Sequence, residues 1–288
     1  MSHLKVLIKN MRPYRSVHYS GLVLGGAFIA CWHPAVKGSF SEYLMRIIFL
    51  FSGIIFAFQA ACVFNDFYDI NGDRVSNPDR PLLTGKVSAS IYKKWGLFCF
   101  FVSVILSYLA GLVPLILILC CYISAVFYSM PPFRLKRFFP LNTLVIALNA
   151  LIAVVAGFSV IAGYETPKLF PHRVAIMIFV VFMFSINIKD IKDREGDLVE
   201  GIKTIPTIMG ERLARAMIIM LTVLAYFSVP VILGITALYY FSIAGSVLGV
   251  YWLLKKKWDE GPYFVTYYVY SAVMFLFLRS ELMYGGII

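Results

Sequence analysis

The sequence predicts an all-α, polytopic membrane protein, and three observations predict this fold class: the composition, a series of long apolar runs, and the distribution of cations. Hydrophobic residues make up 60% of the chain and charged residues 14%, with a mean hydropathy of +0.82. This leaves too little polar surface to cover a water-soluble domain. Helices satisfy their backbone polar groups within each membrane-spanning segment, so the apolar runs are predicted to be helices.

Nine apolar runs are close to the length, about 17 to 25 residues, that a hydrocarbon core roughly 30 Å thick requires. They lie near residues 17–36, 45–64, 95–112, 114–128, 140–162, 172–188, 213–234, 235–254 and 263–280. The third and fourth are separated only by the break at Gly111 to Pro114, which favours a hairpin over one long kinked helix. No small-residue cleavage site follows the first run, so we expect it to be a retained helix and not a secretory signal.

The cations are distributed unevenly between the two ends of these runs. With the N-terminus in the cytoplasm, the Lys and Arg residues outside the cytoplasmic face are Lys37, Arg46, Lys168, Arg173 and Arg279. The positive-inside rule therefore predicts a cytoplasmic N-terminus and cytoplasmic acidic loops, in a bacterial or archaeal plasma membrane. The net charge of +11 then describes a basic inner face, and we expect no nucleic-acid partner.

The acidic residues are concentrated in two windows. Of the 15 Asp and Glu residues, nine lie between Asp66 and Asp79 or between Asp190 and Glu200. The windows contain DFYDINGDRV and DIKDREGDLV, which share the pattern D-x-x-D-x-x-G-D-x-V. This internal repeat predicts a duplication within a single domain of residues 1–288, with copies at about 17–139 and 140–262 that hold the first four and the next four helices.

Each motif would place three carboxylates on one face of a helix. Spacings of 0, 3 and 7 stack them within roughly 60° of arc over about two turns. Such carboxylates repel one another unless a cation is present, which together with the repetition weighs against an ordinary solvated acidic loop. An EF-hand is excluded, because Arg74 and Arg80 stand where that loop needs Gly and Glu.

Dense oxygen ligands with no nearby His or Cys pair favour Mg²⁺ or Mn²⁺ over zinc. A structural cation shared by two helices remains an alternative. The four histidines, His3, His18, His33 and His172, have no metal-ligand spacing and receive no role.

Cations flank both acidic motifs, and a site for a metal alone would not require them. They are Arg74, Arg80 and Lys86 after the first motif and Lys189, Lys192, Arg194 and Lys203 around the second. A metal-bound diphosphate would use such cations, because Mg²⁺ bridges carboxylate and phosphate oxygens while Lys and Arg neutralise the remaining charge. Mutual salt bridges explain some of them. The acidic windows begin where membrane runs end, so a lipid with a diphosphate head would fit here.

A third signal is the stretch YSMPPFRLKR on the same inner face. Its proline pair ends the preceding helix and fixes an extended turn. Tyr128 and Ser129 either line a reaction chamber or pack at the helix end, and Arg137 is as well explained by a topological anchor as by function.

These residues resemble the UbiA-type superfamily of intramembrane prenyltransferases over nearly the whole chain. The family's NDxxDxxxD motif corresponds to Asn65, Asp66, Asp69 and Asp73, and its DxxxD motif to Asp193 and Asp197, with Asp190 one turn earlier. The stretches NPDRPLLTG, YSMPP, RLK and GDLVEGIKTIPTIMG are also similar to family sequence. The resemblance implies a bundle of nine helices around a central cavity, with the acidic motifs facing each other across its cytoplasmic mouth beneath a cap of loops. Two Mg²⁺ ions would hold an isoprenyl diphosphate there.

The resemblance and the charge pattern together select the candidate site residues. The metal set is Asp66, Asp69, Asp73, Asp190, Asp193 and Asp197, of which Asp69, Asp193 and Asp197 are the catalytic candidates. The substrate-binding set is Asn65, Arg80, Lys86, Tyr128, Arg134, Lys136 and Lys192. An alternative for Asp66 and Asp190 is that they orient neighbouring cations. Arg12 has two interpretations, contact with the acceptor and anchoring of the first helix, of which anchoring is favoured.

The predicted activity is Mg²⁺-dependent transfer of an isoprenyl group from an isoprenyl diphosphate to a hydrophobic, aromatic or lipid-like acceptor in the membrane. The expected partners are these two substrates and the lipid bilayer, with no obligate protein partner. Two alternatives are a secondary transporter, whose ion site would be near the bilayer midplane, and a CDP-alcohol phosphatidyltransferase, whose DGxxAR signature is missing. Phenols, naphthoates, chlorins, haem and glycerol-phosphate lipids all remain open as acceptors.

Overall fold

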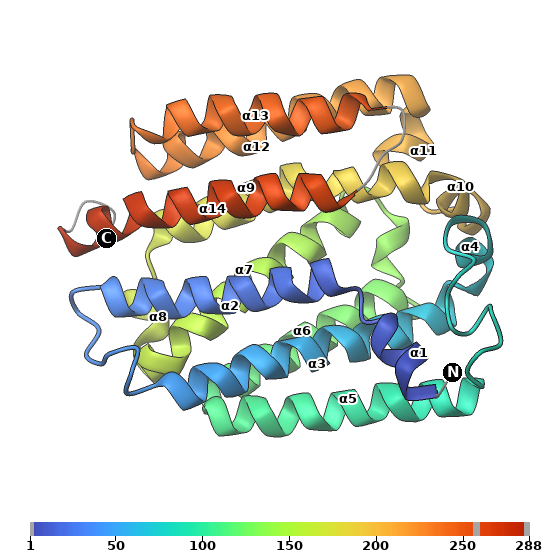
Figure 1. Cartoon of the computed structure of the whole chain (residues 1–288), viewed down its shortest axis with the longest axis horizontal. Coiled ribbons are helices and arrows are strands. Elements are labelled where there is room, and N and C mark those ends of the chain that lie inside the picture. The colour runs from blue at the N-terminus through green and yellow to red at the C-terminus, as the bar shows by residue number, and fades with distance from the viewer. Residues whose placement is uncertain (1–2, 256–259, 285–288) are drawn as a thin grey trace.

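The computed structural model describes residues 3–255 and 260–284, and within these ranges the regular elements are all helical (Figure 1). The α-helices are α1 (His3–Lys9), α2 (Pro13–Trp32), α3 (Leu44–Tyr68), α4 (Ile70–Ser76), α5 (Ala89–Ala110), α6 (Leu112–Ser129), α7 (Leu141–Ala162), α8 (Thr166–Leu169), α9 (His172–Ser185), α10 (Asp190–Glu200), α11 (Ile205–Met209), α12 (Glu211–Leu233), α13 (Leu238–Leu254) and α14 (Glu260–Met283). Short 3₁₀ turns cover Leu135–Arg137, Gly163–Glu165 and Ile186–Lys189. The long helices lie alongside one another, while α1, α4, α10 and α11 gather at one end of the bundle.

Each of the nine predicted apolar runs coincides with a long helix. In the described ranges, seven helical segments are long and apolar enough to cross a membrane; α13 is shorter, and α2 is not among the seven. The all-α membrane fold is therefore confirmed, whereas the count of nine spans is not. The predicted hairpin is present, because the hydroxyls of Ser103 on α5 and Tyr122 on α6 lie 2.5 Å apart across the turn at Gly111.

Small residues hold the centre of the bundle together. Helix α7 packs against α2, α6 and α9, and its buried face carries alanines at 147, 150, 153 and 156. At the α2 and α7 crossing, a Cβ on Gly26 would clash with the backbone carbonyl of Val154, and one on Gly157 with that of Val23. These glycines allow the two backbones to approach closely, as small residues do between membrane helices.

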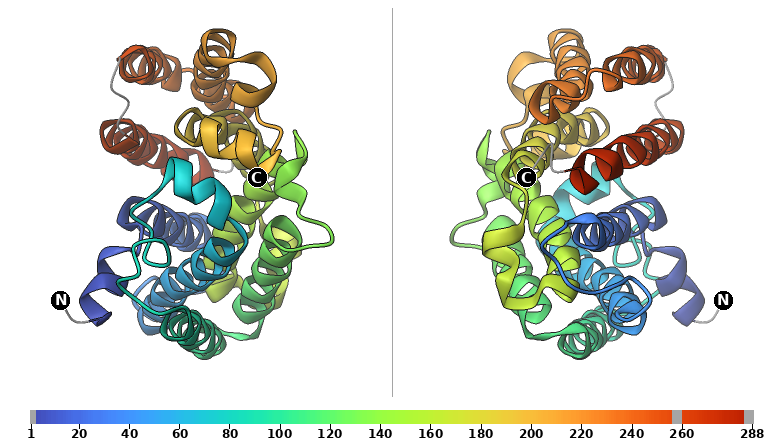
Figure 2. Two further views of the ribbon diagram at one scale, coloured as in Figure 1. Left: turned by 90° about the vertical axis from the view of Figure 1, so that its right-hand side faces the viewer. Right: turned by 90° about the vertical axis from the view of Figure 1, so that its left-hand side faces the viewer.

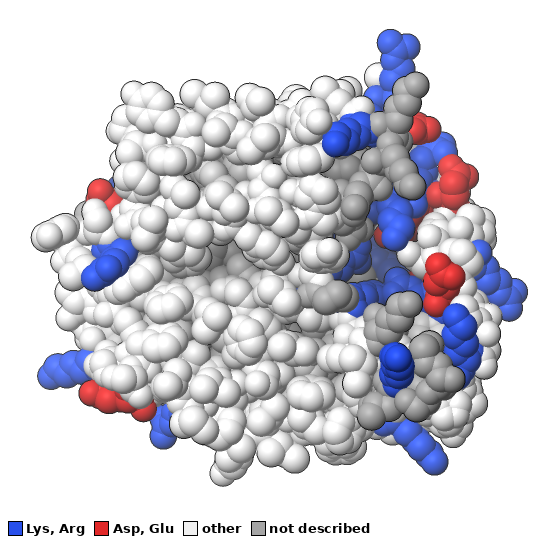
Figure 3. All heavy atoms as spheres, viewed as in Figure 1, with Lys and Arg blue, Asp and Glu red and all other residues white. Residues whose placement is uncertain are grey.

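The outer surface divides into an apolar belt and a polar end. Large side chains such as Phe101, Ile105 and Val247 are more than half exposed on the long helices, as expected for side chains that face lipid. Figure 3 shows Lys, Arg, Asp and Glu side chains gathered mainly at the end that carries α4 and α10, with few along the sides. The site described below lies at that polar end.

Candidate active site

Both acidic motifs lie at the polar end, but the first is not one continuous helical face. Helix α3 ends at Tyr68, Asp69 stands at the break with φ −111° and ψ 15°, and Asp73 lies on the separate helix α4. The prediction of one continuous ridge is therefore wrong for the first motif. It is right for the second, because Asp190, Asp193 and Asp197 all lie on α10.

The two acidic helices cross at the glycine of their shared pattern. Gly72 of α4 and Gly196 of α10 meet so closely that a Cβ on Gly196 would lie 2.6 Å from the carbonyl oxygen of Gly72. The hydrogen bonds at the crossing are reciprocal: the Gly72 amide donates to Glu200 Oε1 at 2.9 Å, and the Gly196 amide donates to Ser76 Oγ at 2.9 Å. Figure 2 shows α4 and α10 side by side at the end of the bundle. Glycine is required on both helices because any side chain would separate the motifs.

Beneath this crossing lies a cavity of about 360 Å³, here called the main cavity, which both motifs line. Its acidic lining residues are Asp69, Asp73, Asp190, Asp193, Asp197 and Glu200, and its basic lining residues are Arg12, Arg15, Arg80, Lys136 and Lys189. Away from these residues its walls are mostly apolar, with side chains such as Ile54, Phe58, Ile118 and Val145. A space that is charged at one end and apolar along its walls suits an amphiphile with an anionic head.

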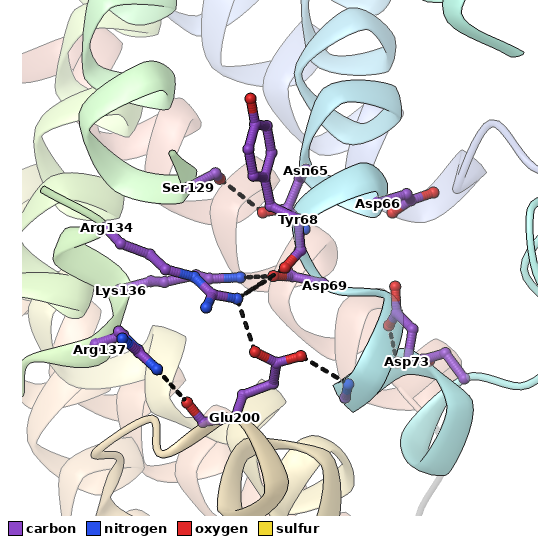
Figure 4. Close-up of polar contacts among 12 residues, drawn as sticks. Asn65, Asp66, Tyr68, Asp69, Asp73, Ser129, Arg134, Lys136, Arg137 and Glu200 are labelled. Carbon is purple, nitrogen blue, oxygen red and sulfur yellow. Dashed lines mark hydrogen bonds and ion pairs between the residues drawn. The ribbon is translucent and has the colours of Figure 1, made fainter. Parts of the chain in front are cut away.

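Asp69 is the centre of a charged network at the mouth of the main cavity (Figure 4). Its Oδ1 accepts from Lys136 Nζ and, at 3.1 Å, from Arg134, while its Oδ2 accepts from Asn65 Nδ2 at 2.6 Å. Ser129 donates in turn to Asn65 Oδ1 at 2.6 Å. Burial lowers the pKa of Lys136, and the Asp69 carboxylate opposes that shift.

Arg134 joins this network to the second motif. It donates to Glu200 Oε2 at 2.8 Å as well as to Asp69, so one guanidinium connects α10 with the end of α3. Glu200 uses its other oxygen for the Gly72 amide. The network therefore fixes the distance between the two motifs as well as the position of Asp69.

Two acids of the second motif, Asp193 and Asp197, accept hydrogen bonds from neutral donors. One amide nitrogen, Asn77 Nδ2, donates to Asp73 Oδ1 at 3.0 Å and to Asp193 Oδ1 at 3.3 Å, so carboxylates of both motifs converge on it. Thr204 Oγ1 donates to Asp197 Oδ2 at 3.4 Å. Burial raises the pKa of Asp73 of the first motif, and the nearby Arg80 opposes that shift.

This donor set fits a divalent cation that also binds a ligand. Within residues 3–255 and 260–284, no three His, Cys, Asp or Glu side chains are already gathered at metal-binding distances. Mg²⁺ does not require such a cage, because it is usually bound through one or two carboxylates together with phosphate oxygens and water. Oxygen-only acids from two helices around one cavity match that preference.

Comparison with known proteins identifies the fold and the family. A profile of the UbiA prenyltransferase family matches residues 23–278. The chain belongs to this family. It is 30% identical over 224 residues to a digeranylgeranylglyceryl phosphate synthase of Methanosphaera stadtmanae, a match that covers 77% of this chain and 76% of the relative. It is 31% identical over 233 residues to the enzyme of that name from Thermococcus gammatolerans, with 76% of this chain and 80% of the relative covered.

The fold matches that of solved structures of the family. A UbiA homologue from Archaeoglobus fulgidus, determined with GPP and Mg²⁺, superimposes with a TM-score of 0.70 at 18% identity and covers 96% of this chain and 99% of its own. The predictions of the family, of the membrane fold and of a prenyltransferase are thereby confirmed.

Asp66 occupies a different place from the other family acids. It does not line the main cavity in the described structure; its Oδ1 accepts from Arg12 at 2.6 Å and its Oδ2 from the Tyr92 hydroxyl at 2.8 Å. The structure thus favours the alternative in which Asp66 orients a neighbouring cation over a role as metal ligand. Asp190 does line the cavity, but one of its oxygens is paired with Lys189.

Some of the predicted substrate-binding residues line the main cavity and others do not. Asn65, Arg80, Tyr128 and Lys136 line the main cavity, and Arg134 reaches it through Asp69. Lys86 and Lys192 are exposed and lie outside its lining, so the structure does not support their predicted contact with a diphosphate. Their charge was visible in the sequence, whereas the outward direction of their side chains was not.

Several cavity residues were not among the candidates. Arg12, for which the sequence favours anchoring over contact with the acceptor, lines the main cavity beside Arg15, His18 and Lys189. Glu200 was available to sequence reasoning, since it continues the spacing of the second motif by three further residues. Nothing in the sequence marks Arg12 before α2, or Arg15 and His18 on it, as part of the site, because only packing brings that helix to the acidic end.

Proposed function

We propose that this chain is an Mg²⁺-dependent prenyltransferase that moves an isoprenyl group from an isoprenyl diphosphate to the hydroxyl of a glyceryl-phosphate lipid. The observation that carries the proposal is the main cavity, in which two acidic motifs and five cations surround one end of a space whose other walls are mostly apolar. The acceptor class is inferred from the relatives, which are named digeranylgeranylglyceryl phosphate synthases. The acidic end is proposed to face the cytoplasm, in line with the positive-inside rule.

The donor would bind with its diphosphate at the acidic end and its isoprenyl chain along the apolar walls. Asp73, Asp193 and Asp197 are proposed to hold Mg²⁺, with Asp69 entering that set when Lys136 turns to phosphate. When bound, Mg²⁺ supplies Lewis-acid stabilisation of the leaving diphosphate. Arg80 and Lys136 add charge-assisted hydrogen bonds to the same group.

Bond breakage then depends on what surrounds the allylic carbon. The C1–O bond breaks with its electron pair on the diphosphate, and positive charge develops on the isoprenyl group. The apolar walls exclude water from that carbon, while aromatic side chains of the lining, such as Phe58 and Tyr122, offer ring faces to the charge. An acceptor oxygen held nearby forms the new bond.

The two earlier alternatives fit the structure less well. The acids lie at the polar end of the bundle and not halfway along the long helices, which is unlike a transporter's ion site. Family membership argues against a CDP-alcohol phosphatidyltransferase.

The test is product analysis with purified protein in lipid nanodiscs. Labelled geranylgeranyl diphosphate, Mg²⁺ and a panel of acceptors should yield a prenylated glyceryl-phosphate lipid and free diphosphate, identified by mass. Chelation of Mg²⁺ should abolish both products, and Mn²⁺ should restore them. A wild-type protein that prenylates no acceptor of the panel, or that works equally well without a divalent ion, would refute the proposal.

A further inference from the structure

A second cavity of about 250 Å³ adjoins the main cavity, and the function proposed above does not yet use it. It lies among α2, α7, α9, α12 and α14. Its walls include Met177 and Ile178 from α9, Val229 from α12, and Met274 and Leu278 from α14. In the described part of the chain, no Asp, Glu, Lys or Arg lines it. Such a space is suited to hydrocarbon and cannot hold a diphosphate.

The two cavities share one boundary. Five residues line both of them: His18, Phe182, Ser185, Tyr263 and Tyr267. The His18 ring is 5.2 Å from the ring centre of Tyr267 and 5.3 Å from that of Phe182, and Tyr19, Phe264 and Tyr268 also lie close to it. Among the residues that the structure describes, none forms a hydrogen bond with the imidazole of His18. Its nitrogens are therefore available to a ligand at the junction.

One face of α2 carries three residues that line the two cavities in succession. Arg15, His18 and Leu22 follow one another at i, i+3 and i+7, which places them on the same side of the helix. Arg15 lines the main cavity, His18 lines both cavities, and Leu22 lines the second. Cation, imidazole and hydrocarbon thus succeed one another in the order in which a glyceryl-phosphate lipid presents its phosphate, its free hydroxyl and its chain.

We propose that the second cavity binds the hydrocarbon chain of a phosphate-bearing lipid alcohol, the acceptor, and that His18 takes the proton from its hydroxyl. This inference rests on the proposed function and adds to it the position of the acceptor. The donor already has a charged end and apolar walls within the main cavity. The uncharged second cavity therefore belongs to the other substrate.

The reaction balances with the groups present. As the donor C1–O bond breaks and its electron pair leaves on the diphosphate, a lone pair of the acceptor hydroxyl forms the new C–O bond to C1. The hydroxyl proton passes to an imidazole nitrogen of His18, and the imidazolium returns it to the departing diphosphate. A neutral imidazole is a suitable general base for this step.

Filling the second cavity tests where the acceptor chain lies. Gly21 is exposed at its edge, and a Cβ there would meet no heavy atom within 4 Å, so the side chain of Gly21→Phe starts from open space at the edge of the cavity. Ala225→Phe fills the cavity from the buried α12 wall and serves as an independent second variant. The matched controls are Val17→Phe and Leu224→Phe, at exposed positions of the same two helices outside both linings.

The measured quantities are the KM values for single-chain geranylgeranylglyceryl phosphate and for geranylgeranyl diphosphate in nanodiscs, for variants that elute as folded protein. Both cavity-filling variants should raise the acceptor KM by about tenfold or more, which corresponds to lost burial of roughly two methylene groups. The donor KM should stay within about twofold, and both controls should match the wild type in each constant. A rise confined to the donor KM would overturn the assignment, and so would unchanged constants in both cavity-filling variants.

The role of His18 is tested separately with His18→Gln. We expect kcat for transfer to fall about 100-fold, as for removal of a general base, with the donor KM changed by less than about twofold. Added imidazole should restore part of the rate in His18→Ala, and an unchanged kcat in His18→Gln would refute the role. A wild type that prenylates no acceptor refutes the proposed function itself, whereas an active wild type with unaffected variants refutes only this inference.

Discussion

The two acidic motifs share a sequence pattern but differ in what surrounds their carboxylates. In the first, Asp66 and Asp69 are paired with three cations from two other segments: Arg12 before α2, and Arg134 and Lys136 before α7. In the second, Asp190 is paired with Lys189, whereas Asp193 and Asp197 accept from the neutral side chains Asn77 and Thr204. Cations therefore hold Asp66 and Asp69 of the first motif, while the acids proposed to hold the metal are Asp73 of the first motif and Asp193 and Asp197 of the second.

The largest loss of prenyl transfer should come from a substitution in the second motif. Asp193→Asn removes the negative charge but keeps the size of the side chain, and we expect prenyl transfer to fall about 1,000-fold through lost stabilisation of the leaving group. The control is Asp79→Asn, which changes an exposed acid of the first window outside the cavity lining and should leave turnover at the wild-type level. Turnover is measured as diphosphate released per minute. Equal losses of turnover in Asp193→Asn and Asp79→Asn would show that Asp193 contributes no more to transfer than an exposed acid.

Lys136→Met tests the cations of the first motif and should have the next largest effect. It removes a buried cation from Asp69 and from the site proposed for phosphate. We expect the KM for the donor to rise about 10- to 100-fold, because charge-assisted hydrogen bonds to the diphosphate are lost. Lys136→Arg should recover part of the loss; a donor KM unchanged in Lys136→Met would show that the cation serves assembly alone.

The crossing of Gly72 and Gly196 sets the distance between the two acidic motifs. A side chain at this crossing should therefore push the motifs apart, and both protein stability and Mg²⁺ activation should fall. Gly196→Ala places a Cβ against Gly72, and we expect a loss of about 1–3 kcal/mol in stability together with weaker Mg²⁺ activation. Gly21→Ala provides the contrast in a helix with open space around it and should stabilise by up to about 1 kcal/mol. Melting temperatures in one detergent compare the two, and a Gly196→Ala protein as stable as the wild type would contradict the close approach.

The smallest effect should come from the exposed cations. Lys86→Ala and Lys192→Ala remove charges that lie outside the cavity lining, and screened surface charges contribute little, so kcat/KM should change by less than about twofold. A larger loss in Lys192→Ala would return this residue to the phosphate-binding set. Steady-state rates at low and high salt separate direct contact from long-range attraction.

The sequence predicts those parts of the site whose residues follow a recognisable spacing within one short stretch of chain. The spacing of Asp190, Asp193 and Asp197 already places these side chains on one helical face, and the structure has them on α10. Sequence reasoning left two roles open for Asp66, because the partners Arg12 and Tyr92 are distant in sequence and reach it only through packing. It assigned His18 no role for the same reason, since a lone histidine in an apolar run has no spacing to interpret.

The sequence by itself determined the membrane class, the family and the two carboxylate motifs, because hydropathy and side-chain spacing are properties of short stretches of chain. Only the tertiary structure decided which acids face the main cavity, which are neutralised by distant cations, and which uncharged space adjoins them. Those outcomes depend on how α2, α4 and α10 pack, and the close approach of Gly72 to Gly196 joins residues more than a hundred positions apart. A contact of that kind depends on both helices at once and cannot be read from either stretch alone.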